Sequence, residues 1–402
     1  MSSGSSNLRA SASDSTRARL LNNILLALAM FIGLDVLVSL VFCREGHFFG
    51  TTLPPYDLLF TDEQRSRLAK LGEDPSDRPG LLDPDLGWSH RANYTGPGGP
   101  TNSAAIRANR EYTRDVPSGI TRVAAFGDSF THSGPIPRIE DTWTYRLEQS
   151  RPNLEVLNFG VSGYGTDQAY LRYRRDGAPF HPNVVLIGLM TENMFRNVSV
   201  YRPAYYHRSG GIGVKPRFKV GAHGELQLLP CPARSAQELK ALIESRDLVE
   251  LLRDTDYWVQ RAPLAYSSSP FFASSLFRIS YAVYEHRRPL AAHYANTSSE
   301  PFQVTLAILR SFHDEALANG ADRALVIAMP TEGDLSQLRL GKPRYWQTLL
   351  DALQARGVPV IDLADPLLAA IGEADVSDYF ASFHYNAAAD AIVAQALAER
   401  IF

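Results

Sequence analysis

The sequence has few cysteines, no excess of positive charge and a single long apolar stretch. Cys43 and Cys231 are its two cysteines in 402 residues, too few for a disulfide framework or a cysteine metal cluster. The 40 basic and 43 acidic residues leave a net charge of −3, which argues against a nucleic-acid-binding surface. We therefore predict no metal, no cofactor and no nucleic-acid partner.

The long apolar stretch runs from Leu20 to Cys43. At about 1.5 Å per residue it is long enough to cross a hydrocarbon core of about 30 Å. Asp35 lies within it and would cost about 2.5 to 3.5 kcal/mol on insertion, which the surrounding leucines and valines can outweigh. The alternative is a buried helix of a soluble protein. Arginines precede the stretch, so we expect the amino terminus in the cytoplasm and the rest in the periplasm or outside the cell.

The composition changes along the chain and predicts four regions. Residues 1–19 are rich in Ser and Ala and are expected to be a disordered cytoplasmic tail. The transmembrane helix at 20–43 is followed by a turn-rich accessory stalk at 44–121 and by a catalytic domain at 122–402. An insertion at about 198–300 interrupts the catalytic domain and is placed to cap its site.

Beyond residue 121, apolar runs of strand length alternate with helical patterns, which is typical of a parallel sheet covered on both faces. We predict five strands at 122–126, 155–158, 184–189, 324–329 and 359–363. The principal helices are expected at 141–149, 167–175, 302–319, 345–356 and 387–400. Within the insertion, a hairpin is predicted at 215–229, with helices at 236–253 and 274–286.

Three of the strands end in small and polar residues. The first ends in Gly127-Asp128-Ser129, the second in Asn158-Phe159-Gly160-Val161-Ser162-Gly163, and the third in Gly188-Leu189-Met190-Thr191-Glu192-Asn193. Ligands of open α/β sheets bind at the carboxyl ends of the strands. A histidine near the carboxyl terminus, His384, supplies a base, so the set suggests a serine hydrolase site.

With these blocks the chain resembles the SGNH hydrolases, the GDSL-like family, from residue 122 to 402. The resemblance implies a three-layer α/β/α, flavodoxin-like parallel sheet. It also implies that Ser129 is the nucleophile, that His384 is the base, and that the Ser129 and Gly163 N–H groups and the Asn193 amide bind the oxyanion. The pattern Gly-x-Ser-x-Gly of α/β-hydrolases is absent at Ser129.

Two blocks depart from the family pattern. The third block has Glu192 beside Asn193, and either residue can align with the family's asparagine. The family places an aspartate two or three residues before the histidine, where this sequence has Ala381 and Ser382. Either Asp378 reaches His384 as the third member of a triad, or the site is a Ser–His dyad.

The sequence thus predicts a membrane-anchored serine esterase or acylhydrolase that acts on O-acyl groups, possible targets being acetyl esters of envelope glycans. An O-acetyltransferase or a lipid esterase would use the same acyl-serine chemistry. A glycan-binding module that has lost turnover is the alternative from another class. Trp88, Trp143 and the tyrosines at 201, 205 and 206 could stack on a sugar or simply pack. The sequence leaves the oligomeric state open.

Overall fold

The computed structural model describes residues 5–73, 80–286 and 289–402. The chain divides into two compact units. The first consists of Met1–Phe60 and Ala262–Arg287, and the second of Thr61–Arg261 and Arg288–Phe402. The predicted insertion is therefore shared between the units, since its central part groups with the amino-terminal segment.

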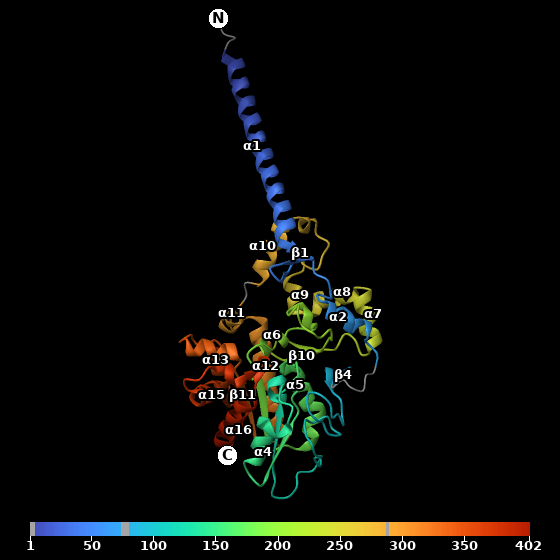
Figure 1. Ribbon diagram of the computed structural model, residues 1–402, viewed down its shortest axis with the longest axis vertical. Helices are drawn as coiled ribbons and strands as arrows, with labels where there is room; N and C mark the ends of the chain where they lie inside the picture. Colours follow the sequence, from blue (N-terminus) through green and yellow to red (C-terminus); the bar gives the residue numbers. More distant parts are fainter. Residues whose placement is uncertain (1–4, 74–79, 287–288) are drawn as a thin grey trace. The chain divides into compact units, whose positions relative to one another are not determined.

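The first unit is built on the long helix α1, Ser5–Phe42 (Figure 1). Its part Arg19–Phe42 is 24 residues long and contains an unburied 18-residue window with a mean hydropathy of 2.7, so it is long and apolar enough to span a membrane. Our expectation of a disordered tail is wrong for the residues from Ser5 to Arg19, which continue the helix. Once an apolar helix has nucleated, each further residue adds a hydrogen bond, so the helix can extend into the flanking Ser- and Ala-rich segment. Residues 1–4 of the predicted tail lie outside the described residues.

Short elements complete the first unit. A small antiparallel sheet follows α1, and helix α10 packs against α1. The strands are β1 Cys43–Arg44, β2 His47–Phe48 and β3 Thr51–Thr52, and the 3₁₀ turn η5 Pro270–Ala273 leads into α10 Ser275–His286.

The second unit contains a five-stranded parallel sheet in the order β12-β11-β8-β6-β7. Its strands are β6 Thr121–Phe126, β7 Leu154–Asn158, β8 Val184–Met190, β11 Arg323–Met329 and β12 Val360–Asp362. Counted along the chain, this order is 2-1-3-4-5, that of flavodoxin-like folds. The predicted fold class is confirmed, and each strand lies within two residues of its predicted bounds.

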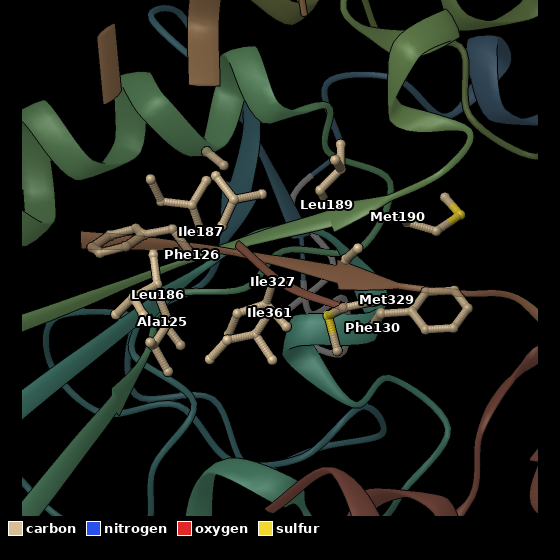
Figure 2. Packing of buried hydrophobic residues seen from close by; sticks show 14 of the residues in the cluster. Ala125, Phe126, Phe130, Leu186, Ile187, Leu189, Met190, Ile327, Met329 and Ile361 are labelled. Atoms are coloured by element: carbon tan, nitrogen blue, oxygen red, sulfur yellow. The ribbon is translucent and has the colours of Figure 1, made fainter. Parts of the chain in front are cut away.

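Helices cover both faces of this sheet. One layer contains α5 Thr166–Arg172, α12 Glu300–Ala318 and α14 Gln347–Gln354, and the other contains α4 Trp143–Gln149, α15 Ala364–Ile371 and α16 Ala387–Ile401. Between the layers lies the core, in which side chains of neighbouring strands such as Phe126, Ile187 and Ile327 are almost completely buried (Figure 2). Parallel strands buried on both faces explain why the sequence shows continuous apolar runs.

Shorter elements surround the sheet. They are α2 Asp62–Ala69, β4 Gly80–Asp83, β5 Gly87–His90, α3 Ser129–His132, α6 Asn193–Arg196, β9 Arg217–Val220, β10 Leu226–Leu229, α7 Ala236–Glu244, α8 Asp247–Thr255, α9 Tyr257–Arg261, α11 Leu290–Ala295, α13 Glu332–Arg339, β13 Phe380–Ala381 and β14 His384–Tyr385. The hairpin β9–β10 is confirmed. The helix predicted at 236–253 is two helices, because Arg246 adopts a left-handed conformation with φ 65°.

Candidate active site

Ser129 lies where the sheet order reverses. It is the first residue of α3, directly after β6, and β6 lies between β7 and β8 in the sheet. Asp128 caps α3, its carboxylate accepting a hydrogen bond from the Phe130 N–H at 2.9 Å. Gly127 permits the sharp turn, since a Cβ there would meet Thr131 Oγ1 at 2.2 Å. The nucleophile candidate therefore stands at the switch point, the usual ligand site of such sheets.

A hairpin brings His384 to this serine from the far end of the chain. Its strands β13 and β14 are joined by Ser382 and Phe383, whose φ angles are 48° and 68°. Two left-handed residues in succession make the tight turn that most often contains Asn-Gly. The buried Tyr385 ties the hairpin to the sheet by donating its hydroxyl to the Pro330 carbonyl at 2.7 Å.

Ser129 and His384 form a hydrogen bond. Ser129 Oγ lies 2.8 Å from His384 Nε2, and His384 Nδ1 lies 2.7 Å from the Ser382 carbonyl oxygen. A carbonyl oxygen can only accept, so Nδ1 carries the ring proton and Nε2 of the neutral ring has a free lone pair. Nε2 can therefore accept the hydroxyl proton of Ser129, which is the geometry of a nucleophile and its general base.

Asp378 is not brought to the histidine. Its side chain is exposed, and in the described parts of the chain no hydrogen bond joins its carboxylate to His384. The backbone of Asp378 instead supports the hairpin, since its carbonyl accepts from the Asn386 amide at 2.7 Å. The backbone carbonyl of Ser382 holds Nδ1 of His384, as expected if the site is a Ser–His dyad.

Asn193 is buried behind the site, with 1% of its surface exposed. Its amide nitrogen lies 3.0 Å from Asp128 Oδ2 and 3.2 Å from the Tyr164 carbonyl, and its oxygen accepts from the Met190 N–H at 2.9 Å. These contacts tie the end of β8 to the capping carboxylate of α3. In this arrangement the Asn193 amide serves Asp128 and does not line the cavity described below.

The neighbouring Glu192 does line that cavity and is held as an anion. Its carboxylate lies 3.3 Å from Arg196 Nε and 3.2 Å from the Tyr205 hydroxyl. Burial opposes its ionisation, but the charges of Arg196 and Arg202 and the Tyr205 hydrogen bond lower the pKa of Glu192. An anion cannot donate a hydrogen bond to a developing oxyanion, so Glu192 is unsuited to that role.

The other two predicted oxyanion donors are the backbone N–H groups of Ser129 and Gly163. Neither donates a backbone hydrogen bond to another described residue. Gly163 has φ 83°, and a Cβ there would meet Arg202 Nη1 at 2.7 Å. The site therefore requires glycine at this position.

Trp88 and Arg202 hold the peptides on either side of Gly163. Trp88 Nε1 donates to the Ser162 carbonyl at 3.0 Å, and Arg202 Nη1 donates to the Gly163 carbonyl at 3.0 Å. In a trans peptide the carbonyl and the following N–H point in opposite directions. By holding the Ser162 carbonyl, Trp88 therefore directs the Gly163 N–H away from its own ring.

Two histidines pack together at the end of α3: the buried His132, its last residue, and the half-buried His90, whose ring centroid lies 4.3 Å away. Burial, with the nearby charges of Arg172 and Arg107, lowers the pKa of His90 to about 3. Burial, together with His90 and Arg107, likewise holds the pKa of His132 well below its ordinary value. Both rings stay neutral, and the His132 ring contacts Arg107 Nη1 at 3.2 Å. His132 is thus a packing residue under the nucleophile, and His384 is the histidine that can act as a base.

Ser129 and His384 open into a cavity of about 1290 Å³. Its walls come from the accessory segment, from the strand ends and from the insertion. They combine apolar side chains (Leu71, Leu81, Leu82, Trp88, Phe130, Ile212, Leu239 and Phe383) with charged ones (Arg67, Glu192, Arg196, Arg202 and Glu332). Within the described residues, no cluster of three His, Cys, Asp or Glu side chains is suited to hold a metal.

The sequence missed the residues that support the site. Ser382 was read as a missing aspartate, although its backbone carbonyl holds the ring. The sequence offers Trp88 as a sugar platform or a packing residue and gives no signal for Arg202 and Arg196. A carbonyl acceptor cannot be read from residue types, because every residue has one. Trp143, a second candidate platform, is buried with 1% of its surface exposed.

The chain matches no family model, and no curated protein matches it. Solved structures with a similar arrangement include a putative lipolytic protein of the G-D-S-L family from Desulfitobacterium hafniense, at 14% identity and a TM-score of 0.31, covering 69% of this chain and 98% of that one. An acetylxylan esterase from Geobacillus stearothermophilus shares 12% identity at a TM-score of 0.38, covering 71% and 95%. A lipase/acylhydrolase from Enterococcus faecalis shares 11% identity at a TM-score of 0.35, covering 70% and 95%.

Proposed function

We propose that this chain is a carboxylic ester hydrolase that acts through an acyl-serine intermediate. The observation that carries the proposal is the 2.8 Å hydrogen bond between Ser129 Oγ and His384 Nε2 at the wall of a large cavity. A serine hydroxyl is a weak nucleophile until an adjacent base takes its proton. The tautomer set by the Ser382 carbonyl leaves His384 ready for that step.

In the first half of the reaction, Ser129 Oγ attacks the ester carbonyl while His384 Nε2 takes the hydroxyl proton. The N–H groups of Ser129 and Gly163 stabilise the oxyanion, each donor being worth about 3 to 4 kcal/mol in comparable sites. The imidazolium then returns the proton to the leaving alcohol, and the acyl group stays on Ser129. Water, activated by the same histidine, hydrolyses the acyl-serine in the second half.

This site is a dyad in our proposal. The Ser382 carbonyl fixes the tautomer of His384 and orients the ring, as an aspartate would in a triad. A neutral carbonyl stabilises the imidazolium less than a carboxylate does. Asp378 has only a supporting role in the hairpin, through its backbone.

We propose that α1 anchors the enzyme in a membrane with the second unit on the extracytoplasmic side. The apolar part of α1 is of spanning length, and Arg17 and Arg19 flank its amino-terminal end. Positive residues tend to remain in the cytoplasm. The enzyme would then meet its substrate at the cell envelope, a periplasmic location in a bacterium with two membranes.

We further propose that the substrate is an O-acyl ester of a large polar alcohol, such as an acetylated glycan. Ligand cavities for small molecules measure about 300 to 1,000 Å³, and this one is larger at about 1290 Å³. Its charged residues lie beside apolar side chains, a mixture suited to a sugar with its polar rim and apolar face. A cavity of this size also has room for an acceptor alcohol, so an acyltransferase that uses the same acyl-serine is the second candidate.

Hydrolysis of p-nitrophenyl esters tests this proposal. The full-length chain in detergent should cleave the acetate ester faster than the octanoate and palmitate esters, whereas a lipid esterase would favour the long chains. Ser129→Ala should abolish turnover, and Ser162→Ala, also on the cavity wall, should leave it within a few-fold. No turnover by the wild type with any ester or added acceptor would favour a glycan-binding module.

A further inference from the structure

Asp35, the charged residue within the candidate membrane span, is hydrogen-bonded to the residues at the start of α10. Asp35 Oδ1 accepts a hydrogen bond from the Ser274 hydroxyl at 2.8 Å and another from the Leu276 N–H at 2.7 Å. Ser274 directly precedes α10, so the carboxylate caps the amino terminus of that helix. A carboxylate at this place satisfies a free N–H and interacts favourably with the helix dipole.

The cap lies inside the apolar helix. Asp35 precedes Phe42, the end of the candidate span, by seven residues, a length of about 10 Å along the helix axis. If lipid surrounds α1 as far as Phe42, the start of α10 lies at the same depth as Asp35. The segment Pro270–Phe277 is therefore held beside the lipid-facing part of α1.

The composition of this segment suits a lipid environment. It contains three phenylalanines and no charged residue from Tyr266 to Phe277. Phe271 is 64% exposed, and its ring lies 5.4 Å from that of Phe277, which in turn lies 5.6 Å from Phe272. Phenylalanine is among the residues that insert most favourably into a membrane. The first charge, Arg278, is turned to the backbone, donating to the Pro54 carbonyl.

We propose that Pro270–Phe277 is a second membrane contact, inserted in the leaflet at the carboxyl-terminal end of α1 and held there by Asp35. The partner is the lipid bilayer itself. This inference rests on the proposed membrane span of α1. It also explains Asp35, because two hydrogen bonds offset part of the cost of placing a carboxylate within the bilayer.

Nitroxide accessibility tests the proposal in the full-length chain, reconstituted in vesicles of phosphatidylcholine and phosphatidylglycerol. In a Cys43→Ser/Cys231→Ser background, a nitroxide is attached at Phe271→Cys or, as a second exposed site, at Ala273→Cys. Leu26→Cys provides the reference for lipid and Leu340→Cys the reference for water, since both leucines are exposed, at 61% and 72%. Collisions with oxygen, which partitions into lipid, are compared with collisions with a water-soluble nickel chelate.

The labels at 271 and 273 should show the high ratio of oxygen to nickel collisions of position 26. If their collision ratios equal that of position 340 while the ratio at position 26 indicates lipid, α1 spans the membrane but the second contact is absent. If position 26 itself is in water, the span fails and this inference with it. The label at position 271 could instead show few oxygen collisions together with a spectrum broadened by a nitroxide on another chain. That result would mean that a second copy of the chain covers the segment, and it would overturn the proposal.

The role of Asp35 is tested by Asp35→Leu in the same labelled chains. The substitution keeps the span apolar and removes the cap, so position 26 should stay in lipid while the ratio at position 271 falls toward that of position 340. An unchanged ratio at position 271 would show that Asp35 does not hold the segment.

Discussion

At the scale of single residues, the site depends on side chains that hold backbone groups in place. Asp128 caps the helix of the nucleophile and is itself held by Asn193 at 3.0 Å and by Arg196 Nη1 at 3.2 Å. The aspartate of the Gly-Asp-Ser motif therefore has a structural role that is separate from the reactivity of the serine hydroxyl. Asp128 sets the start of α3 and with it the direction of Ser129.

Asn193→Ala should lower both stability and rate. The substitution leaves the buried Met190 N–H without its acceptor, while the Tyr164 carbonyl keeps its donor Arg196 Nη1 at 3.0 Å. We expect a loss of about 1 to 3 kcal/mol in the free energy of unfolding. The melting temperature and kcat, measured together, should both fall, and Glu192→Gln should change kcat little. A fall in kcat by about 100 to 1,000-fold with an unchanged melting temperature would instead make Asn193 an oxyanion donor.

Asp390 makes the stability of the second unit depend on pH. Burial raises its pKa to about 7, although the Trp143 N–H donates to its carboxylate at 2.9 Å. Because the pKa in the folded chain is higher than in the unfolded chain, the stabilisation is fully present below about pH 4 and is lost as the pH rises through 7. Between pH 5 and pH 8 the wild type should lose about 2 kcal/mol through this group.

Asp390→Asn keeps an acceptor for Trp143 and removes this ionisation. The melting temperature of the variant relative to the wild type should therefore rise between pH 5 and pH 8, measured in the same detergent. Asp351→Asn, an exposed change on α14, should show no such trend. An equal difference at both pH values for Asp390→Asn would mean that the carboxyl does not ionise in this range.

At the scale of elements, the hairpin β4–β5 contributes to the site together with the ends of the sheet strands, the hairpin β13–β14 and the insertion. It is fixed to the second unit by the Gln168 amide, which donates to the Leu86 carbonyl at 2.7 Å, and by the Tyr164 hydroxyl, which donates to the Trp88 carbonyl at 2.6 Å. The predicted accessory segment is thus, from Thr61 onward, part of the unit that carries the site. Its role is to hold the peptide of Gly163 through Trp88.

Trp88→Phe should reduce kcat by about tenfold and leave KM nearly unchanged with p-nitrophenyl acetate. Phenylalanine keeps a ring against Tyr164 but cannot donate to the Ser162 carbonyl, so the Gly163 N–H loses part of its orientation. A rise in KM with unchanged kcat would contradict this role and identify Trp88 as a surface for the substrate.

The sheet could be predicted from the sequence because buried parallel strands are continuous apolar runs, and those of β6, β8 and β11 end in clear turn signals. The pair Ser129 and His384 followed from the motif resemblance. The support of His384 could not be predicted, since it is a backbone carbonyl in a turn of Ser382 and Phe383, two residues that seldom adopt left-handed conformations. The pairing of Asp35 with α10 joins segments far apart in the chain, with no local pattern to indicate it.

At the scale of the whole molecule, the first unit is assembled from two distant parts of the chain, Met1–Phe60 and Ala262–Arg287. The second part lies within the predicted insertion, whose residues before 262 and after 287 belong to the second unit. The chain therefore passes between the two units three times, after residues 60, 261 and 287.

A fusion of alkaline phosphatase after Phe402 tests the proposed topology. The phosphatase is active only outside the cytoplasm, so the fusion should be active if the arginines before the span keep the amino terminus inside. A phosphatase joined before Met1 should be inactive. The opposite pattern would show that the second unit faces the cytoplasm.

The central claim is that Ser129 is a nucleophile activated by His384 without an aspartate. Its most direct test is the rate at which a fluorophosphonate modifies Ser129, followed by peptide mass spectrometry at pH 8 on the wild type, Asp378→Asn and His384→Ala. We predict modification of Ser129 in the wild type, a rate within a few-fold for Asp378→Asn, and a loss of at least 100-fold for His384→Ala. A loss of about 10⁴-fold for Asp378→Asn would restore the triad, and absence of the adduct on wild-type Ser129 would contradict the account.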